Sequence, residues 1–198
     1  MKAVMAPVPP EILALRKRTG ADRYDEMWEG VLHMVAAPNR EHQDLKGALE
    51  TYLRLHWARP CGCKVYSEIN LAKPGEWPGN YRIPDLVLLT PERFAIDRNE
   101  WFEGPPEVVV EIRSPDDESY EKLEFYAALG VPEVWIIERD SKIPEIYRLT
   151  TQPAYQQMQA DADGWLQSAS VPVELRPHQG KLSIRLTADH DSQEELPN

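Results

Sequence analysis

The sequence predicts an α/β domain with a mixed central β-sheet, flanked by helices and by peripheral hairpins. Two β-branched runs, Ile83–Leu89 and Glu107–Ile112, are expected as neighbouring buried strands. A helical segment from Ser114 to about Leu129 follows, and the apolar run Glu133–Glu138 comes after it. A strand, a helix and a second strand form a βαβ unit, whose strands are parallel and whose crossover is right-handed.

Four elements are expected before this unit. Residues 1–10 are rich in proline and form an arm, and Glu11–Arg18 form a short helix. Two strands joined by a turn fall within Tyr24–Val35. A long helix runs from the N-cap Asn39 to about Trp57, because its apolar residues keep helical spacing.

The segments around the βαβ unit complete the predicted fold. Lys64–Leu71 alternates between apolar and polar residues, as a half-buried strand does. Ile143–Leu149 is expected to return as a hairpin partner of the preceding strand. The predicted organisation is one domain, 1–198, with an arm at 1–10, a core at about 20–150, peripheral strands at 151–187 and a frayed tail at 188–198.

Composition narrows the class of protein. No apolar run approaches the roughly 18 residues of a membrane span, and the N-terminal apolar stretch is too short for a signal peptide. We therefore expect a cytoplasmic protein without a membrane partner. Cys61 and Cys63 are too few for a zinc site and too close for comfortable disulfide geometry. A free, reduced pair is expected, and metal or redox chemistry is the alternative.

The charge balance restricts the partners. Lysine and arginine number 22 and acidic residues 33, which gives a formal net charge of −11. Broad, non-specific nucleic-acid binders are normally basic, so the balance argues against that class. It leaves room for an enzyme with a local basic groove, because the shape of the field matters more than the total.

Two acidic residues stand where buried strands would carry none. Asp85 and Glu111 each interrupt an apolar run, and isolated carboxylates are rarely buried unless they are paired or bind a metal. Lys122 lies at the edge of the apolar face of the following helix, and helical side chains lean toward the helix N-terminus, here toward Glu111. Two carboxylates and a lysine suit metal-dependent phosphodiester cleavage. The alternatives are a turn for Asp85, an ion pair with Arg113 or Lys122 for Glu111, and a solvated Lys122.

Two further residues are candidates for supporting roles. His42 extends the apolar stripe of the long helix, where it is either a packed histidine or a group at the mouth of the site. Glu68 shares a strand face with Tyr66 and points either into a polar cleft or to water.

The ordered blocks of the chain resemble the Uma2 family, also called DUF820, over about residues 20–150. The blocks are EGVLHM, PNREHQDLKGALETYL, YSEINL, IPDLVLL, PPEVVVEIRSP, EKLEFYAALGVPEVWII and IYRL. The resemblance implies the restriction-endonuclease-like fold of the PD-(D/E)XK superfamily, and a mixed central sheet is expected accordingly.

The resemblance also implies a site. Pro84 and Asp85 match the P-D of the family motif, and Glu111 matches its second acid. Arg113 stands where the nuclease pattern has lysine, and a guanidinium stays protonated, so it cannot act as a base. Lys122 is expected to replace the missing lysine from the helix. Glu68, His42 and Arg113 are carried as supporting residues.

The function implied is a Mg²⁺- or Mn²⁺-dependent endonuclease that hydrolyses DNA phosphodiester bonds. Asp85, Glu111 and the backbone carbonyl of Ile112 would hold the ion, and Lys122 would act on the water or the phosphate. A homodimer is expected, since cutting two strands favours two copies of one site. The alternatives are a catalytically inactive nuclease-fold binding or regulatory module, favoured by the net charge and by Arg113, and a metal-dependent hydrolase of RNA or nucleotides.

Overall fold

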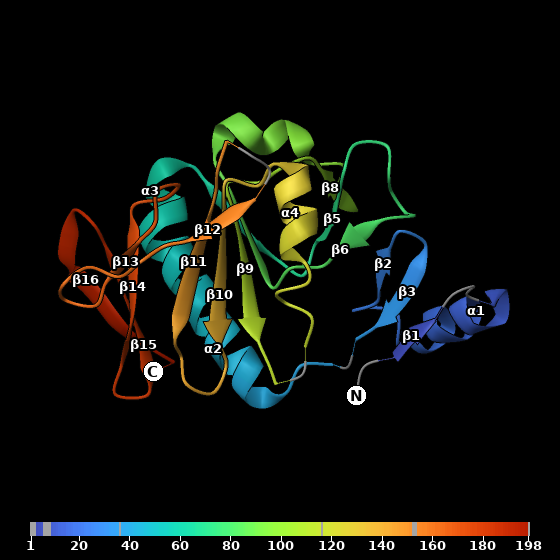
Figure 1. Cartoon of the computed structure of the whole chain (residues 1–198), viewed down its shortest axis with the longest axis horizontal. Coiled ribbons are helices and arrows are strands. Elements are labelled where there is room, and N and C mark those ends of the chain that lie inside the picture. The colour runs from blue at the N-terminus through green and yellow to red at the C-terminus, as the bar shows by residue number, and fades with distance from the viewer. Residues whose placement is uncertain (1–2, 6–8, 36, 116, 152–153, 198) are drawn as a thin grey trace.

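The computed structural model describes residues 3–5, 9–35, 37–115, 117–151 and 154–197. A mixed six-stranded sheet, which we call the central sheet, has the order β12-β11-β10-β9-β7-β4 (Figure 1). Its strands are β4 (Lys64–Ser67), β7 (Leu86–Leu89), β9 (Val108–Arg113), β10 (Glu133–Glu138), β11 (Pro144–Leu149) and β12 (Tyr155–Gln157). The pair β9–β10 is parallel, as predicted, and the other pairs are antiparallel.

The central sheet is buried on both faces because its strands alternate apolar side chains between two cores. Val108 and Val110 pack into one core with Leu45 and Leu49 of α2 (Arg40–Tyr52). Val109 packs into the other core, with side chains of α4 (Leu123–Leu129). Glu111 follows the alternation onto the α4 face, where it is 3% exposed. The period of two along β9 therefore places this acid beneath α4.

The two helices differ from their predicted lengths. Asn39 caps α2 by accepting the His42 N–H at 3.0 Å, and the helix continues as a π-helical segment (Leu53–Ala58) and α3 (Arg59–Cys61). The predicted helix from Ser114 begins only at Leu123. The Asp117 side chain accepts the backbone N–H of Ser114 at 2.6 Å and stabilises a turn in place of the first helical residues.

A second sheet, the N-terminal sheet, has the order β1-β3-β2-β6-β5-β8. Its strands are β1 (Ala3–Met5), β2 (Glu26–Trp28), β3 (Val31–Met34), β5 (Asn70–Ala72), β6 (Tyr81–Arg82) and β8 (Trp101–Glu103). The helix α1 (Pro10–Thr19) projects from this side of the molecule, and a 3₁₀-helix spans Pro91–Ile96 (Figure 1). Part of the predicted arm thus forms β1, and 1–2 and 6–8 lie outside the described residues.

The predicted strand Lys64–Leu71 is split between the two sheets. It becomes β4 and β5 because the chain turns at Glu68, whose φ is 54°. Glycine and short polar residues normally take this left-handed conformation, so a glutamate there marks a sharp local bend.

The predicted frayed tail is wrong. The C-terminal sheet consists of β13 (Leu166–Gln167), β14 (Val173–His178), β15 (Lys181–Leu186) and β16 (Asp189–Leu196). β16 is polar in sequence, yet its backbone pairs with β15 and its Leu196 is 1% exposed (Figure 1). The buried carboxylate of Glu133 ties this sheet to the central one by accepting the Ala169 N–H at 2.9 Å.

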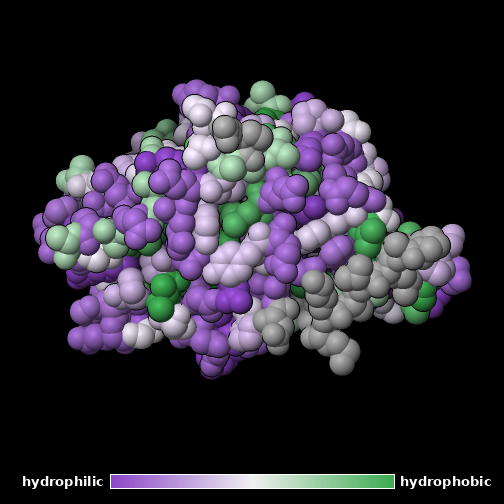
Figure 2. Space-filling view, viewed as in Figure 1, coloured by the Kyte–Doolittle hydropathy of each residue, from purple (hydrophilic) through white to green (hydrophobic). Residues whose placement is uncertain are grey.

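Two further sequence predictions have a structural outcome. Cys61 and Cys63 form a disulfide, contrary to the expected reduced pair, because Gly62 between them adopts a φ of 71° and brings their Cα atoms to 5.3 Å. Within the described ranges, every helix lacks the length and apolarity needed to cross a membrane. The face in Figure 2 is mostly hydrophilic, with apolar side chains gathered in small separate patches.

Candidate active site

A pocket of about 280 Å³ lies where the central sheet meets the N-terminal sheet. Its walls come from β2 and β3, the start of α2, the residues before β7, the end of β9 and the turn between β9 and α4. Six residues that the sequence analysis singled out line it: His42, Glu68, Asp85, Glu111, Ile112 and Lys122. The structure therefore brings together side chains that are far apart in the sequence.

Asp85 stands directly before β7, and its carboxylate is held from two sides. Its Oδ2 accepts the backbone N–H of Ile112 at 2.7 Å, and His42 Nε2 lies 3.2 Å away. A carboxylate oxygen accepts this hydrogen bond when the ring proton of His42 is on Nε2. The Asp85 side chain is 15% exposed and keeps acceptor positions for a ligand in the pocket.

Glu111 is the most perturbed acid of the pocket. The Tyr126 hydroxyl donates to its Oε1 at 2.5 Å, and Lys122 Nζ lies 3.2 Å from the carboxylate. Burial raises the pKa of Glu111 to about 8; the Lys122 ammonium opposes this rise, and the negative charge of Asp85 adds to it. Near neutral pH the carboxyl therefore holds a proton unless another positive charge enters the pocket.

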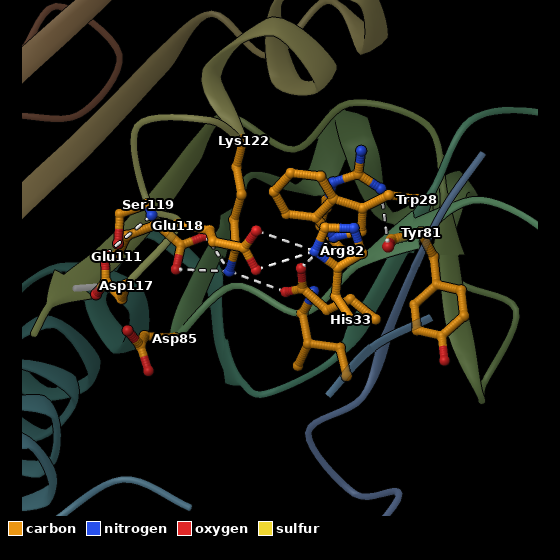
Figure 3. A network of polar contacts seen from close by, with 12 residues as sticks. Trp28, His33, Tyr81, Arg82, Asp85, Glu111, Asp117, Glu118, Ser119 and Lys122 are labelled. Atoms are coloured by element: carbon orange, nitrogen blue, oxygen red, sulfur yellow. Dashed lines mark hydrogen bonds and ion pairs between the residues drawn. The ribbon is translucent and has the colours of Figure 1, made fainter. Parts of the chain in front are cut away.

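Lys122 directly precedes α4, and its side chain extends into the polar network of the pocket (Figure 3). Its Nζ lies 2.8 Å from Glu26 and 3.2 Å from Glu111. Burial lowers the pKa of Lys122, but the negative charges of Glu111 and Glu26 outweigh burial and raise the pKa above its ordinary value. The side chain is thus an ammonium. It can stabilise negative charge on a phosphate, but it has no lone pair with which to take a proton from water.

Glu26 is a pocket residue that the sequence analysis missed. It lies on β2, is 1% exposed, and accepts the Ile83 backbone N–H at 2.8 Å and Trp28 Nε1 at 2.7 Å. Two other acids, Asp25 and Glu29, stand close to it in the sequence, so the local pattern does not mark Glu26 as a pocket residue.

The three supporting residues, Glu68, His42 and Arg113, differ in their position relative to the pocket and in their partners. Glu68 lines the pocket and pairs with the buried Lys46, and with Arg23 at 3.1 Å. His42 is 7% exposed and contacts Asp85. Arg113 is not among the pocket-lining residues. Its guanidinium pairs with Glu138 of the neighbouring strand and lies 4.9 Å from the centre of the Tyr120 ring.

The donor set fits a hard divalent cation. Among the described residues, no group of three or more His, Cys, Asp or Glu side chains is arranged so that it could hold a metal ion. Asp85 and Glu111 offer two carboxylates that line the same pocket and act on each other electrostatically. Mg²⁺ is commonly bound by one or two carboxylates while it keeps several waters. Glu26, Asp85 and, once it loses its proton, Glu111 carry more negative charge than the Lys122 ammonium balances, so a cation would offset the excess.

Comparisons with known proteins agree with the fold described above. A solved structure from Anabaena variabilis, described as "a putative nuclease belonging to DUF820", is similar with a TM-score of 0.59 and 16% sequence identity. The match covers 74% of this chain and 82% of that one. No curated protein matches. The chain therefore has the mixed α/β fold of a nuclease-like DUF820 protein, and the predicted fold class is confirmed.

The sequence comparison is more specific. The profile of the Uma2 family, described as "Putative restriction endonuclease", matches residues 9–185. The chain belongs to the Uma2 family, and the resemblance found in its sequence blocks is confirmed.

Proposed function

We propose that this protein is a metal-dependent endonuclease that hydrolyses DNA phosphodiester bonds with Mg²⁺ or Mn²⁺. The observation that carries the proposal is the convergence of Asp85, Glu111 and Lys122 on one pocket. The family description and the description of the structural neighbour both name nucleases, which supports the reaction class.

Each residue has a part in the proposed reaction. Asp85 and Glu111, with the backbone carbonyl of Ile112, would hold the ion. The ion would neutralise phosphate charge and lower the pKa of a bound water. The Ile112 N–H and His42 fix Asp85, so that its remaining lone pairs face one direction. Lys122 stabilises the negative charge that develops on the phosphate and leaves the activation of water to other groups.

A specific observation favours a second candidate, a nuclease-fold module that binds without cleaving. The basic residues near the pocket are occupied by acids: Arg139 pairs with Asp140 at 2.7 Å and Arg23 pairs with Glu68 at 3.1 Å. Paired arginines release fewer counterions from nucleic acid than free ones, and the net charge is −11. Hydrolysis of RNA or nucleotides is a third candidate for the same pocket.

Nicking of supercoiled plasmid in Mg²⁺ or Mn²⁺ tests the proposal. Wild-type protein should nick, EDTA should stop the reaction, and Asp85→Asn should lower the rate at least about 100-fold by removing a charged ligand. Asp44→Asn, a change at an exposed acid of α2, is the matched control and should retain the wild-type rate. Metal-dependent cleavage of RNA or nucleotides alone would identify the third candidate. Absence of cleavage and of Mn²⁺ binding would identify the binding module.

The proposal includes a homodimer, because two pockets can address two strands of a duplex. Light scattering after size-exclusion chromatography measures the mass directly. A mass of one chain, 22.7 kDa, would contradict this part of the proposal alone.

A further inference from the structure

Glu26 reaches the pocket from a different sheet than the two proposed metal ligands. Glu111 lies on β9 of the central sheet and Asp85 stands directly before β7 of that sheet, whereas Glu26 lies on β2 of the N-terminal sheet. Its side chain is 2% exposed, and an anion buried to this degree persists only where its charge and its lone pairs are satisfied.

Both oxygens of Glu26 are fixed by hydrogen bonds that involve neither Lys122 nor the proposed metal ligands. Oε1 accepts the Ile83 backbone N–H at 2.8 Å, and Oε2 accepts the indole N–H of Trp28 at 2.7 Å. The Lys122 ammonium lies 2.8 Å from Oε1. Glu26 is thus a fixed acceptor toward which the Lys122 ammonium extends.

Glu111 offers Lys122 a longer contact, at 3.2 Å. If Lys122 had only this partner, an ionised Glu111 and Lys122 would form a closed, neutral ion pair at the pocket. A divalent cation would then have to separate that pair and leave a buried ammonium without a counter-charge, which is costly. A second, permanent counter-ion for Lys122 removes this cost.

We propose that Glu26 is a positioning residue, which holds the Lys122 ammonium at a fixed place and leaves the Glu111 carboxylate available to a divalent cation. The inference rests on the proposed function, since it concerns the metal site of that function. The N-terminal sheet then has a part in the chemistry. The metal ligands come from the central sheet and the residue before β7, and Glu26 on β2 fixes the Lys122 ammonium that faces the substrate.

A simpler role for Glu26 would be to add negative charge near the ion. The two roles differ in their dependence on Lys122. If Glu26 acts through the lysine, its replacement matters only while the lysine is present. If it acts as bare charge, Glu26→Gln weakens cation binding equally with and without the lysine.

The experiment is a double-mutant cycle on Mn²⁺ affinity, measured by titration calorimetry or by the electron paramagnetic resonance of free Mn²⁺. The four proteins are wild type, Glu26→Gln, Lys122→Met and the double variant. We expect Glu26→Gln to weaken Mn²⁺ binding by roughly 10- to 100-fold in the wild-type background, as loss of a group that orients a ligand does. In the Lys122→Met background the same change should not weaken it. Glu29→Gln, an exposed acid of the same hairpin, is the matched control and should leave the affinity unchanged.

The outcomes separate the inference from the function on which it rests. Wild-type protein that binds no Mn²⁺ overturns the proposed function. Wild-type binding with an unaffected Glu26→Gln variant, or with equal weakening in both backgrounds, overturns only the role of Glu26. If Glu26→Gln fails to fold while the double variant folds, Glu26 serves Lys122, as inferred. If both fail to fold, the bonds to Ile83 and Trp28 are its main role, and the inference is wrong.

Discussion

Replacement of Glu111 by glutamine should remove a pH-dependent loss of stability from the metal-free protein. The pKa of Glu111 is raised from 4.5 to about 8, chiefly by burial. Between these values the folded protein binds more protons at this site than the unfolded chain does. The contribution of Glu111 to stability is therefore fully present below pH 4.5 and is lost as pH rises toward and through 8.

The size of the effect follows from the same two pKa values. Linkage gives a loss of about 4 kcal/mol from this one group between pH 5 and pH 9, which is a ceiling because water can enter the pocket when the acid ionises. A free-energy change of 1 kcal/mol shifts the melting temperature of a chain of this size by about 2–4 °C. Between pH 5 and pH 9 the melting temperature of the wild type should therefore fall by roughly 8–16 °C more than that of Glu111→Gln. Glutamine cannot ionise, and its amide oxygen can still accept the Tyr126 hydroxyl.

The assay is thermal unfolding in EDTA at pH values from 5 to 9, followed by circular dichroism. The difference between Glu111→Gln and wild type should grow with pH in favour of the variant. Glu121→Gln, an exposed acid one residue before Lys122, should show the pH dependence of wild type. If the difference in unfolding free energy between Glu111→Gln and wild type stays constant within about 1 kcal/mol from pH 5 to pH 9, the assignment of a protonated, desolvated Glu111 is refuted.

Three other changes test the energetics of the site. Lys122→Met should lower the free energy of unfolding by about 3–5 kcal/mol at pH 9 in urea titrations, because Glu26 and Glu111 lose their shared cation; a loss below about 1 kcal/mol would contradict the buried pairing. Tyr126→Phe should cost about 1–3 kcal/mol in the same assay, since its hydroxyl donates to a charged or polar carboxyl at 2.5 Å; a neutral effect would show that the bond is not formed. Gly130→Ala at the end of α4, where φ is 86°, should cost about 1 kcal/mol and leave Mn²⁺ affinity unchanged, and an altered affinity would show that α4 moves with the site.

The central elements could be predicted from the sequence because their pattern is local. The β-branched runs that became β7, β9 and β10 are too apolar to lie outside a core, and one acid in such a run stands out at once. The expected approach of Lys122 to Glu111 is also found, although Lys122 directly precedes α4 and does not lie inside the helix. These inferences needed only the period of each element.

The missed features depend on partners distant in the chain. Glu26 is satisfied by Ile83, 57 residues away, and by Lys122, so its own strand gives no sign of where its charge goes. β16 reads as a polar tail because its stability comes from backbone pairing with β15 and from Leu196, not from its own composition. Composition and periodicity do not contain such tertiary contacts.

The late start of α4 has a different cause. Helical periodicity extends back to Ser114, but Asp117 hydrogen-bonds to backbone N–H groups and offers the chain a turn instead. The sequence is compatible with either local structure, and periodicity alone did not decide between them.

The most direct test of the central claim, that Asp85 and Glu111 form one cation site, is an anomalous-difference map from crystals soaked in Mn²⁺. We predict a peak in the pocket, with a carboxylate oxygen of each residue at about 2.0–2.3 Å and with no contact to Lys122. Well-ordered crystals with an empty pocket and Mn²⁺ only at surface acids would contradict it.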